Sequence, residues 1–224
     1  MTEESQFPLV TFALFAYNQE EYIREAMEAA LAQDYPNLEI IVSDDASLDG
    51  TWRVIEQIAK AYVGRHTLIV NRNELNLGPF KHVLKVGRQA RGALVVLAAG
   101  DDLSKSERVS RLAKAWCDTG AWGLSSRYDV IDAGGEIVAR GQRTEELFSP
   151  GFNLRNYFCR SEGVNIVHGA TSAYSREVFD LVDFESAPDV LSEDGMLSLI
   201  INFLGKLIVN LDESLIFYRV HERA

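Results

Sequence analysis

Three pairs of adjacent acidic residues fall where an apolar strand is expected to end or a helix to begin. They are Asp44-Asp45, Asp101-Asp102 and Glu193-Asp194. Neighbouring carboxylates repel each other unless a cation is shared between them. The first chemistry that these pairs indicate is therefore a divalent metal ion that holds a phosphorylated ligand. For any one pair taken alone, a turn or a helix cap is the competing interpretation.

The pair Asp101-Asp102 follows the apolar run 94–99 and Gly100. A continuous apolar run of this kind is typical of a strand that is buried on both faces of a parallel sheet. Ligands bind beyond the carboxyl ends of such strands in open α/β sheets. We therefore expect Asp101 and Asp102 at the mouth of a crevice.

Two earlier apolar runs, 9–15 and 38–43, predict further strands of the same sheet. The first run ends near Tyr17 and the second leads to Asp45. Sequential parallel strands bring their carboxyl ends to one edge of a sheet. Tyr17 and Asp45 are therefore expected beside Asp101.

The first half of the chain alternates between predicted strands and helices. Strands are expected at 9–15, 38–43, 66–70 and 94–99, and helices at 18–33, 51–62 and 80–91. In the second half, strands are expected at 123–126, 128–132, 136–140, 206–211 and 215–220, with helices at 104–119 and 193–203 and a short one from 175. Asn18 with Glu21, and Ser104 with Glu107, are the predicted helix caps. The first half is thus typical of a parallel sheet with right-handed crossovers.

The composition is that of a globular protein with enough apolar residues for a packed core. The chain has 224 residues, of which 47% are hydrophobic, and a formal net charge of -11. Nucleic acids favour an excess of Lys and Arg, so this charge argues against a nucleic-acid partner. Cys117 and Cys159 are expected to be reduced, because they show neither CxxC nor metal-ligand spacing.

The N-terminal residues 1–6 are acidic and polar, unlike a signal peptide. No segment reaches the ~18 apolar residues that a membrane span needs. We therefore expect a cytoplasmic protein and leave open a peripheral association with the inner face of the membrane.

Short motifs with a consistent order extend along the whole chain. In the first half they are Pro8-Leu9-Val10-Thr11, Tyr17-Asn18, Val42-Ser43-Asp44-Asp45-Ala46-Ser47-Leu48-Asp49-Gly50-Thr51, Asn76-Leu77-Gly78 and Gly100-Asp101-Asp102. In the second half they are His168-Gly169-Ala170-Thr171, Ser175-Arg176-Glu177-Val178-Phe179, Glu193-Asp194 and Tyr218-Arg219-Val220-His221. As a set they resemble the family 2 glycosyltransferases, which have the GT-A fold.

This resemblance implies an α/β fold with a Rossmann-like, mostly parallel central sheet, flanked by helices, and a smaller mixed acceptor-side half. It implies a single domain, 1–224, with a nucleotide-sugar-binding half, 1–102, and an acceptor or catalytic half, 103–224. The implied activity is inverting transfer of a sugar from a nucleoside-diphosphate donor, most simply a UDP-sugar, to an acceptor hydroxyl. The implied cofactor is Mn²⁺ or Mg²⁺, and the implied acceptor is a glycan or lipid-linked glycan, as in the assembly of bacterial surface polysaccharides.

The nucleotide and metal residues follow from the matching positions of the family's motifs. Tyr17 would stack near the base, Asp45 would accept a hydrogen bond from the base N3–H, and Asp101 would face the ribose. Asp102 would hold the metal ion, and His221 would approach the metal or the diphosphate. Core packing of Tyr17 and a solvated position of His221 are the alternatives.

On the acceptor side, Asp194 matches the catalytic base of inverting members. Its alternative is an acidic residue in the first turn of a helix, where it would stabilise the helix N-terminus. Gly169, Ala170, Thr171 and Glu193 would belong to the loop that faces the acceptor or the diphosphate.

The sequence departs from the family pattern at several positions. Gly100 replaces the first Asp of the Asp-x-Asp motif, and Phe15 stands where members often carry a small residue, a hydroxylic residue or Pro. The stretch 81–83, Lys-His-Val, replaces an Ala-Arg-Asn sequence that contacts the donor in many members. The chain also ends three residues after His221, whereas many relatives continue.

Three other functions compete with sugar transfer. A nucleotide-sugar-binding module of the same fold without turnover is favoured if Glu193 and Asp194 lie far from Asp101 and Asp102. A phosphoacceptor signalling domain also has paired acids at a strand end, but the second half of the chain disfavours it. A Rossmann dehydrogenase is weaker still, because no G-x-G-x-x-G follows the first strand.

Overall fold

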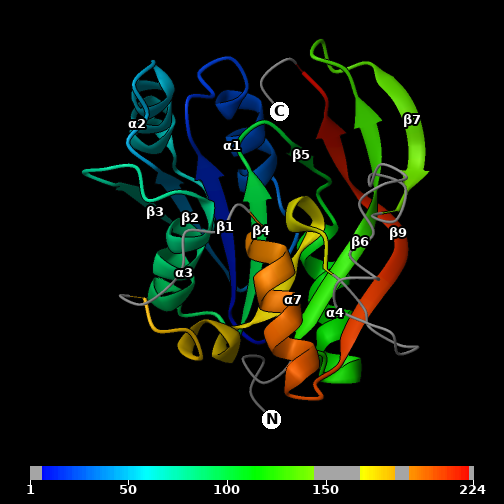
Figure 1. The fold of residues 1–224 in the computed structure, drawn as a ribbon. Helices are drawn as coiled ribbons and strands as arrows, with labels where there is room; N and C mark the ends of the chain where they lie inside the picture. Colours follow the sequence, from blue (N-terminus) through cyan, green and yellow to red (C-terminus); the bar gives the residue numbers. More distant parts are fainter. Residues whose placement is uncertain (1–6, 144–166, 185–191, 222–224) are drawn as a thin grey trace.

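The computed structural model describes residues 7–143, 167–184 and 192–221. These residues form one nine-stranded sheet with helices on both faces (Figure 1). The strand order is β3-β2-β1-β4-β8-β6-β9-β5, and β7 pairs with β6 outside this path. Both halves of the chain therefore contribute strands to the same sheet, whereas the number of domains stays a prediction.

The first half forms the parallel part of the sheet, as the apolar runs predict. Its strands are β1 (Val10–Ala16), β2 (Leu38–Asp44), β3 (Thr67–Arg72) and β4 (Leu94–Ala99), and its helices are α1 (Ile23–Leu31), α2 (Thr51–Ala61) and α3 (Pro79–Gln89). β1 lies between β2 and β4 and pairs in parallel with both. Every residue of β2 is buried, as expected for a strand that is covered on both faces.

The second half supplies the mixed part of the sheet. Its elements are β5 (Leu103–Ser104), α4 (Arg108–Thr119), β6 (Gly123–Ile131), β7 (Ile137–Gln142), η2 (Gly169–Thr171), β8 (Ala173–Ser175), η3 (Arg176–Asp180), α7 (Glu193–Phe203) and β9 (Ile208–Arg219). β8 is antiparallel to both β4 and β6, and so joins the two parts. The expected helix 193–203 has the predicted bounds.

Two expected breaks in the second half are wrong. The predicted strands 123–126 and 128–132 form the continuous β6, and the predicted strands 206–211 and 215–220 form the continuous β9. β6 and β9 pair in parallel along most of their length, with register shifts between Ser125 and Tyr128. The polar residues that suggested a break lie at these irregularities, and the backbone pairing of β6 with β9 continues on both sides of them.

The first helix also starts later than the sequence predicts. Asn18 and Glu21 do not cap it, since α1 begins at Ile23 and Tyr22 is its N-cap. Asn18 adopts a φ of 54°, and its Oδ1 accepts a hydrogen bond from the backbone N–H of Leu48 at 2.8 Å. The side chain thus ties the end of β1 to the turn after β2 and is not available to the helix.

The predicted cap at Ser104 and Glu107 is wrong for a similar reason. Ser104 belongs to β5, which pairs with β9, and α4 begins only at Arg108. The hydroxyl of Ser104 accepts a hydrogen bond from Nη1 of Arg108 at 2.9 Å. Pairing with a distant strand therefore overrides the local capping signal.

Two clusters of buried side chains cover the two faces of the sheet. One includes residues of α1, α2 and α4, and the other includes residues of α3, η3 and α7. In the residues that the structure describes, no helix combines the length and apolarity of a membrane span. Cys117 is free and exposed, and Cys159 lies outside the described residues.

Candidate active site

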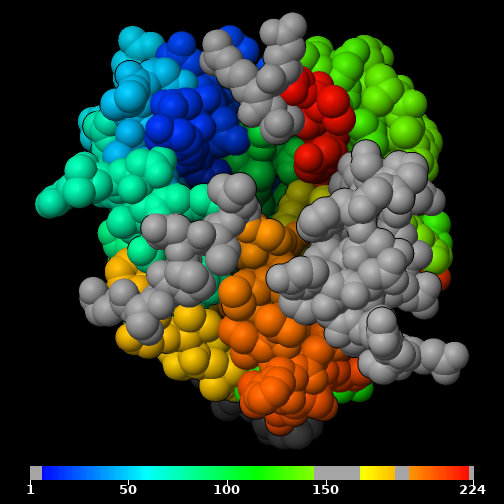
Figure 2. All heavy atoms as spheres, in the orientation of Figure 1, coloured from blue at the N-terminus to red at the C-terminus, as the bar shows by residue number. Residues whose placement is uncertain are grey.

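A cavity of about 490 Å³ opens at the carboxyl ends of β1 and β4, a size typical of small-molecule sites. In the space-filling view, the segment after β4 lies in a hollow between the N-terminal part and the end of β9 (Figure 2). The described residues that line it are Phe15, Ala16, Tyr17, Gln19, Asp45, Asn76, Gly78, Pro79, His82, Val83, Leu97, Ala98, Ala99, Asp101, Asp102, Gly169, Ala170, Glu193 and Tyr218.

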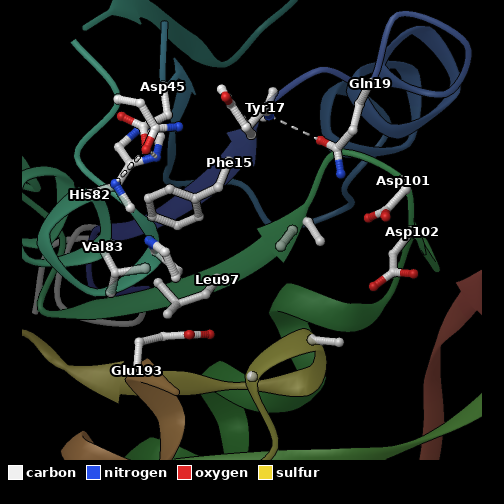
Figure 3. Close-up of a pocket in the computed structure, with 18 of the residues that line it drawn as sticks. Phe15, Tyr17, Gln19, Asp45, His82, Val83, Leu97, Asp101, Asp102 and Glu193 are labelled. Atoms are coloured by element: carbon white, nitrogen blue, oxygen red, sulfur yellow. Dashed lines mark hydrogen bonds and ion pairs between the residues drawn. The ribbon is translucent and has the colours of Figure 1, made fainter. Parts of the chain in front are cut away.

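Most of the predicted site residues meet in this cavity. Those that line it are Tyr17, Asp45, Asp101, Asp102, Gly169, Ala170 and Glu193. Thr171, Asp194 and His221 lie outside its lining. Tyr17 and Asp45 lie toward one side of the cavity and Glu193 lies toward the opposite side (Figure 3). Glu193 thus shares a cavity with Asp101 and Asp102, the opposite of the arrangement that would favour a binding module without turnover.

Asp45 is buried after the end of β2 and is held by several donors. Its Oδ1 accepts hydrogen bonds from the Asn73 amide at 2.6 Å and from the backbone N–H of Leu77 at 2.9 Å. Its Oδ2 accepts from the backbone N–H of Gly78 at 3.0 Å and shares the Leu77 N–H at 3.1 Å, so three donors hold the carboxylate. A carboxylate has about four acceptor positions, so about one position is left for a ligand.

The neighbours of Asp45 have different roles. Asp44 is fully buried and pairs with Arg72, whose Nε lies 3.2 Å from its Oδ2, so it belongs to the scaffold. Tyr17 is 45% exposed and lines the cavity, which does not fit the alternative of core packing.

Asp101 and Asp102 follow β4 and have unequal surroundings. Oδ1 of Asp102 accepts a hydrogen bond from the backbone N–H of Arg219 at 2.8 Å, whereas its Oδ2 is buried without a partner among the described residues. Burial, and then the charge of Asp101, raise the pKa of Asp102 to about 8. Oδ2 of Asp101 lies 3.0 Å from Nε2 of His221.

This arrangement fits a divalent cation that is shared with a ligand. Among the described residues, no group of three or more His, Cys, Asp or Glu side chains forms a complete metal cage. Mg²⁺ in particular is commonly bound by one or two carboxylates together with substrate phosphates. The unpaired Oδ2 of Asp102, next to Asp101, has the chemistry that a ligand of this kind requires.

Glu193 and Asp194 open α7 and differ in what they contact. Oδ2 of Asp194 accepts a hydrogen bond from the backbone N–H of Gly169 at 2.8 Å, and its Oδ1 accepts from that of Gly195 at 2.7 Å. The hydrogen bond from Gly195 agrees with the alternative interpretation of Asp194 as an acidic residue that stabilises the first turn of the helix. Burial, and then the charge of Asp194, raise the pKa of Glu193 to about 7.

His82 lines the cavity and belongs to the stretch 81–83, which departs from the family pattern. Its Nε2 lies 2.7 Å from the hydroxyl of Ser43, and its Nδ1 lies 4.0 Å from Oδ2 of Asp45. Burial lowers the pKa of His82 to about 4, although the charge of Asp45 opposes this shift. The imidazole is therefore neutral at pH 7.

Arg108 lies close to the site, and the sequence analysis did not select it. Its fully buried guanidinium donates to the carbonyls of Leu97 at 2.7 Å and Ala170 at 3.1 Å. It thereby ties β4 to the η2 loop, which lines the cavity. An Arg near the start of a predicted helix is normally expected at the surface, so the sequence gives no indication that Arg108 is buried.

The model of glycosyl transferase family 2 matches residues 11–182 of the sequence. The chain belongs to this family. The match covers the strand ends that carry Asp45, Asp101 and Asp102, and also the η2 loop. It disfavours the phosphoacceptor and dehydrogenase alternatives.

Curated relatives of the chain are longer than the chain itself. An uncharacterised glycosyltransferase of Nostoc sp. is 26% identical over 92% of this chain and 62% of its own length. The succinoglycan biosynthesis protein ExoO of Rhizobium meliloti is 30% identical over 69% of this chain and 44% of its own length. The chain thus spans between two fifths and two thirds of these relatives.

Solved structures of low sequence identity share the GT-A fold. A mannosyltransferase of Pyrobaculum calidifontis, in complex with GDP-mannose and Mn²⁺, is 22% identical and has a TM-score of 0.74 over 97% of this chain and 59% of its own. Residues 1–349 of TarS from S. aureus, in complex with UDP-GlcNAc, are 20% identical and have a TM-score of 0.68 over 96% of this chain and 59% of that one.

Proposed function

We propose that the chain transfers a sugar, with inversion, from a nucleoside-diphosphate donor to an acceptor hydroxyl, and that a divalent cation assists the reaction. A UDP-sugar is the simplest donor, although the ligands of the two structural neighbours include both GDP-mannose and UDP-GlcNAc. A glycan or lipid-linked acceptor agrees with the name of the succinoglycan relative. We also propose that the protein acts in the cytoplasm and associates peripherally with the membrane.

The charge of the cavity is the observation that carries the proposal. The described lining residues include four carboxylates, those of Asp45, Asp101, Asp102 and Glu193, and no Lys or Arg. His82 adds no positive charge at pH 7, because its pKa is lowered to about 4. Because its pKa is raised to about 8, the Asp102 carboxyl is largely protonated at pH 7. A divalent cation that entered with a diphosphate would displace this proton and offset the negative charge that the cavity and the diphosphate share. The unpaired Oδ2 of Asp102 is the position that receives such a cation.

The residues on the nucleotide side divide the work of binding. The Arg219 N–H holds one oxygen of Asp102, which leaves the other for the metal ion. When bound, Mn²⁺ or Mg²⁺ would neutralise the charge that develops on the leaving diphosphate. Asp45 offers its remaining acceptor position to the base, Tyr17 offers its ring, and Asp101, held by His221, faces the ribose.

Asp194 is the proposed base that takes the proton of the acceptor hydroxyl. Its carboxylate lies directly behind the cavity wall, since a Cβ on Gly169 would lie 3.4 Å from its Oδ2. The hydrogen bond from the Gly169 N–H fixes its orientation. Asp194 does not line the cavity itself, so the acceptor hydroxyl would reach this carboxylate past the η2 loop.

Calorimetry with UDP and with GDP, each with and without Mn²⁺, tests the metal-dependent binding. The wild type should bind one nucleotide with Mn²⁺ and lose that binding with a chelator. Asp102→Asn should weaken Mn²⁺-dependent binding by about 100-fold or more, because mutating a residue that only supports a metal ligand already costs about 10- to 100-fold. Asp118→Asn, the same change at an exposed position of α4, is the matched control and should bind like the wild type. Equal binding by Asp102→Asn and the wild type would refute the proposed metal ligand.

Donor hydrolysis and sugar transfer test the catalytic step. Asp194→Asn should bind the nucleotide with unchanged affinity but lose turnover. A wild type that binds the nucleotide but neither hydrolyses nor transfers any sugar from UDP- and GDP-sugar donors would be the binding module without turnover instead. Loss of nucleotide binding in Asp194→Asn would contradict the division of roles.

A further inference from the structure

One side of the cavity carries a single carboxylate among apolar side chains. Glu193 lies there near Leu97 and Val83, opposite Tyr17 and Asp45 (Figure 3). If the base lies against Tyr17 and the diphosphate beside Asp101-Asp102, the remaining volume is the part next to Glu193. Its apolar walls suit the C–H face of a sugar ring, and its carboxylate suits a hydroxyl group.

Among the residues that the structure describes, Glu193 has no partner side chain or neighbouring backbone N–H that would satisfy its carboxylate. The hydrogen bond that favours its charged form comes from its own backbone N–H, and no other described residue is a source of such a bond. A half-buried carboxylate without donors is costly, and a ligand that supplies one recovers part of this cost. Sugar hydroxyls are donors of this type.

Gly169 makes room for the Glu193 carboxylate at the cavity wall. A Cβ at this position would lie 2.7 Å from Oε1 of Glu193, which is closer than real contacts allow. The backbone of Gly169 is also held in place, because its N–H donates to Asp194. The loop and the start of α7 thus fix the position of Glu193 in the wall.

We propose that Glu193 selects an uncharged donor sugar, by accepting a hydrogen bond from a sugar hydroxyl and by repelling a sugar that carries a carboxylate. This inference rests on the sugar-transfer function proposed above. The repulsion is not compensated, since the described residues that line the cavity include no Lys or Arg. A metal ion beside Asp102 would be engaged by the diphosphate. Neutral hexoses are therefore favoured over hexuronic acids.

Two donors that differ at one carbon atom test this selection. UDP-glucose and UDP-glucuronate carry a CH₂OH group and a carboxylate, respectively, at the same position. With Mn²⁺ at pH 8, where Glu193 is charged, calorimetry of the wild type should give at least tenfold weaker binding of UDP-glucuronate. Glu193→Gln should reduce this ratio to below threefold and should leave the affinity for UDP within twofold. If the nucleotide test selects GDP, GDP-mannose and GDP-mannuronate replace the pair.

Glu177→Gln is the matched control, because Glu177 is an exposed acidic residue in the first turn of η3. It should keep the wild-type ratio. The inference is overturned if the wild type binds both donors equally, or if Glu193→Gln keeps the tenfold ratio. If Glu193→Gln instead keeps both affinities and loses turnover alone, Glu193 is a base and the inference is also wrong. Absence of any Mn²⁺-dependent nucleotide binding would refute the proposed function itself, whereas normal UDP binding with an unchanged ratio would refute only the selection by Glu193.

Discussion

A carboxylate lines the cavity at each of two opposite ends, and the two carboxylates differ in the hydrogen-bond donors that the protein gives them. Asp45, after β2, accepts hydrogen bonds from Asn73, Leu77 and Gly78. Glu193, at the start of α7, has no donor among the other described residues, and burial raises its pKa to about 7. The nucleotide end is thus organised by the protein, whereas the opposite end leaves its carboxylate to be satisfied by a ligand.

This difference follows from the elements that supply each end. The loop after β3 brings two backbone N–H groups to Asp45, because Gly78 takes a φ of 75° that few other residues adopt. At the other end, the backbone N–H of Gly169 is already engaged by Asp194. The Gly169 N–H is therefore used by Asp194, and no described residue of the η2 loop donates a hydrogen bond to Glu193.

Arg108 ties β4 to the η2 loop at the Glu193 end, and its removal should have the largest effect. Arg108→Met leaves the buried carbonyls of Leu97 and Ala170 without their donor. We expect the free energy of unfolding to fall by about 4 kcal/mol, the size seen when a buried polar network is broken. Urea denaturation measures this change. Arg111→Met, on the same helix but exposed in an ion pair with Glu213, should cost less than about 1 kcal/mol.

Asp45→Asn should break the organised end of the cavity. The amide has one oxygen for donors from three residues, so its NH₂ group must face one of the backbone N–H groups. We expect a loss of about 3 kcal/mol in stability, because a buried donor is left unsatisfied next to a lost charged hydrogen bond. Urea denaturation should show this loss at pH 7. A stability equal to that of the wild type would mean that the donors do not organise Asp45.

The sequence predicts which strand ends meet, and this is why it finds most of the cavity. Parallel neighbours align their carboxyl ends, so the apolar runs 38–43 and 94–99, which pair with the run 9–15 on its two sides, bring Asp45 and Asp101 to one edge of the sheet. The wrong predictions depend on partners that are distant in the sequence. Asn18 has a good capping sequence but bonds to Leu48, and Ser104 has one but pairs in β5.

The sequence alone also leaves open which residue of an acidic pair faces the ligand. Asp45 lines the cavity and Asp44 belongs to the scaffold, whereas in the later pair the first residue, Glu193, lines it. The direction depends on the exact residue at which the strand ends or the helix starts, and this is the least reliable part of a sequence prediction. Arg108 shows the same limit, since its burial depends on carbonyls from β4 and η2.

Glu193→Gln, at the opposite end of the cavity from Asp45, should stabilise the folded protein in a pH-dependent way. A carboxyl whose pKa rises on folding from 4.5 to about 7 binds more protons in the folded state, so the stability of the wild type falls as the pH rises through this range. Gln does not titrate. The variant should therefore be more stable at pH 8 by roughly 2 kcal/mol, after a discount for water in the cavity, and equal to the wild type near pH 4.

Thermal or urea unfolding of both proteins at pH 4, 6 and 8 checks this expectation. The signs of the two changes in unfolding free energy test the comparison. Asp45→Asn should destabilise the protein at pH 8, whereas Glu193→Gln should stabilise it. If both substitutions destabilise by similar amounts at pH 8, the two ends do not differ as we infer.

Gly169→Ala should give the smallest effect and isolates the position of the Glu193 carboxylate. The added Cβ would meet Oε1 of Glu193 at 2.7 Å, and the flexible side chain can move away more easily than the loop. The stability should therefore change by less than about 1 kcal/mol, while affinity for UDP-glucose should fall roughly fivefold, or about 1 kcal/mol, with UDP binding preserved. Calorimetry with UDP and with UDP-glucose measures the two affinities.

Gly134→Ala is the control and should change neither affinity, because its added Cβ would lie 3.4 Å from its nearest neighbour, Oδ1 of Asp132. Equal weakening of UDP and UDP-glucose would mean that the η2 loop acts on the nucleotide, and that Glu193 is not confined to the sugar end.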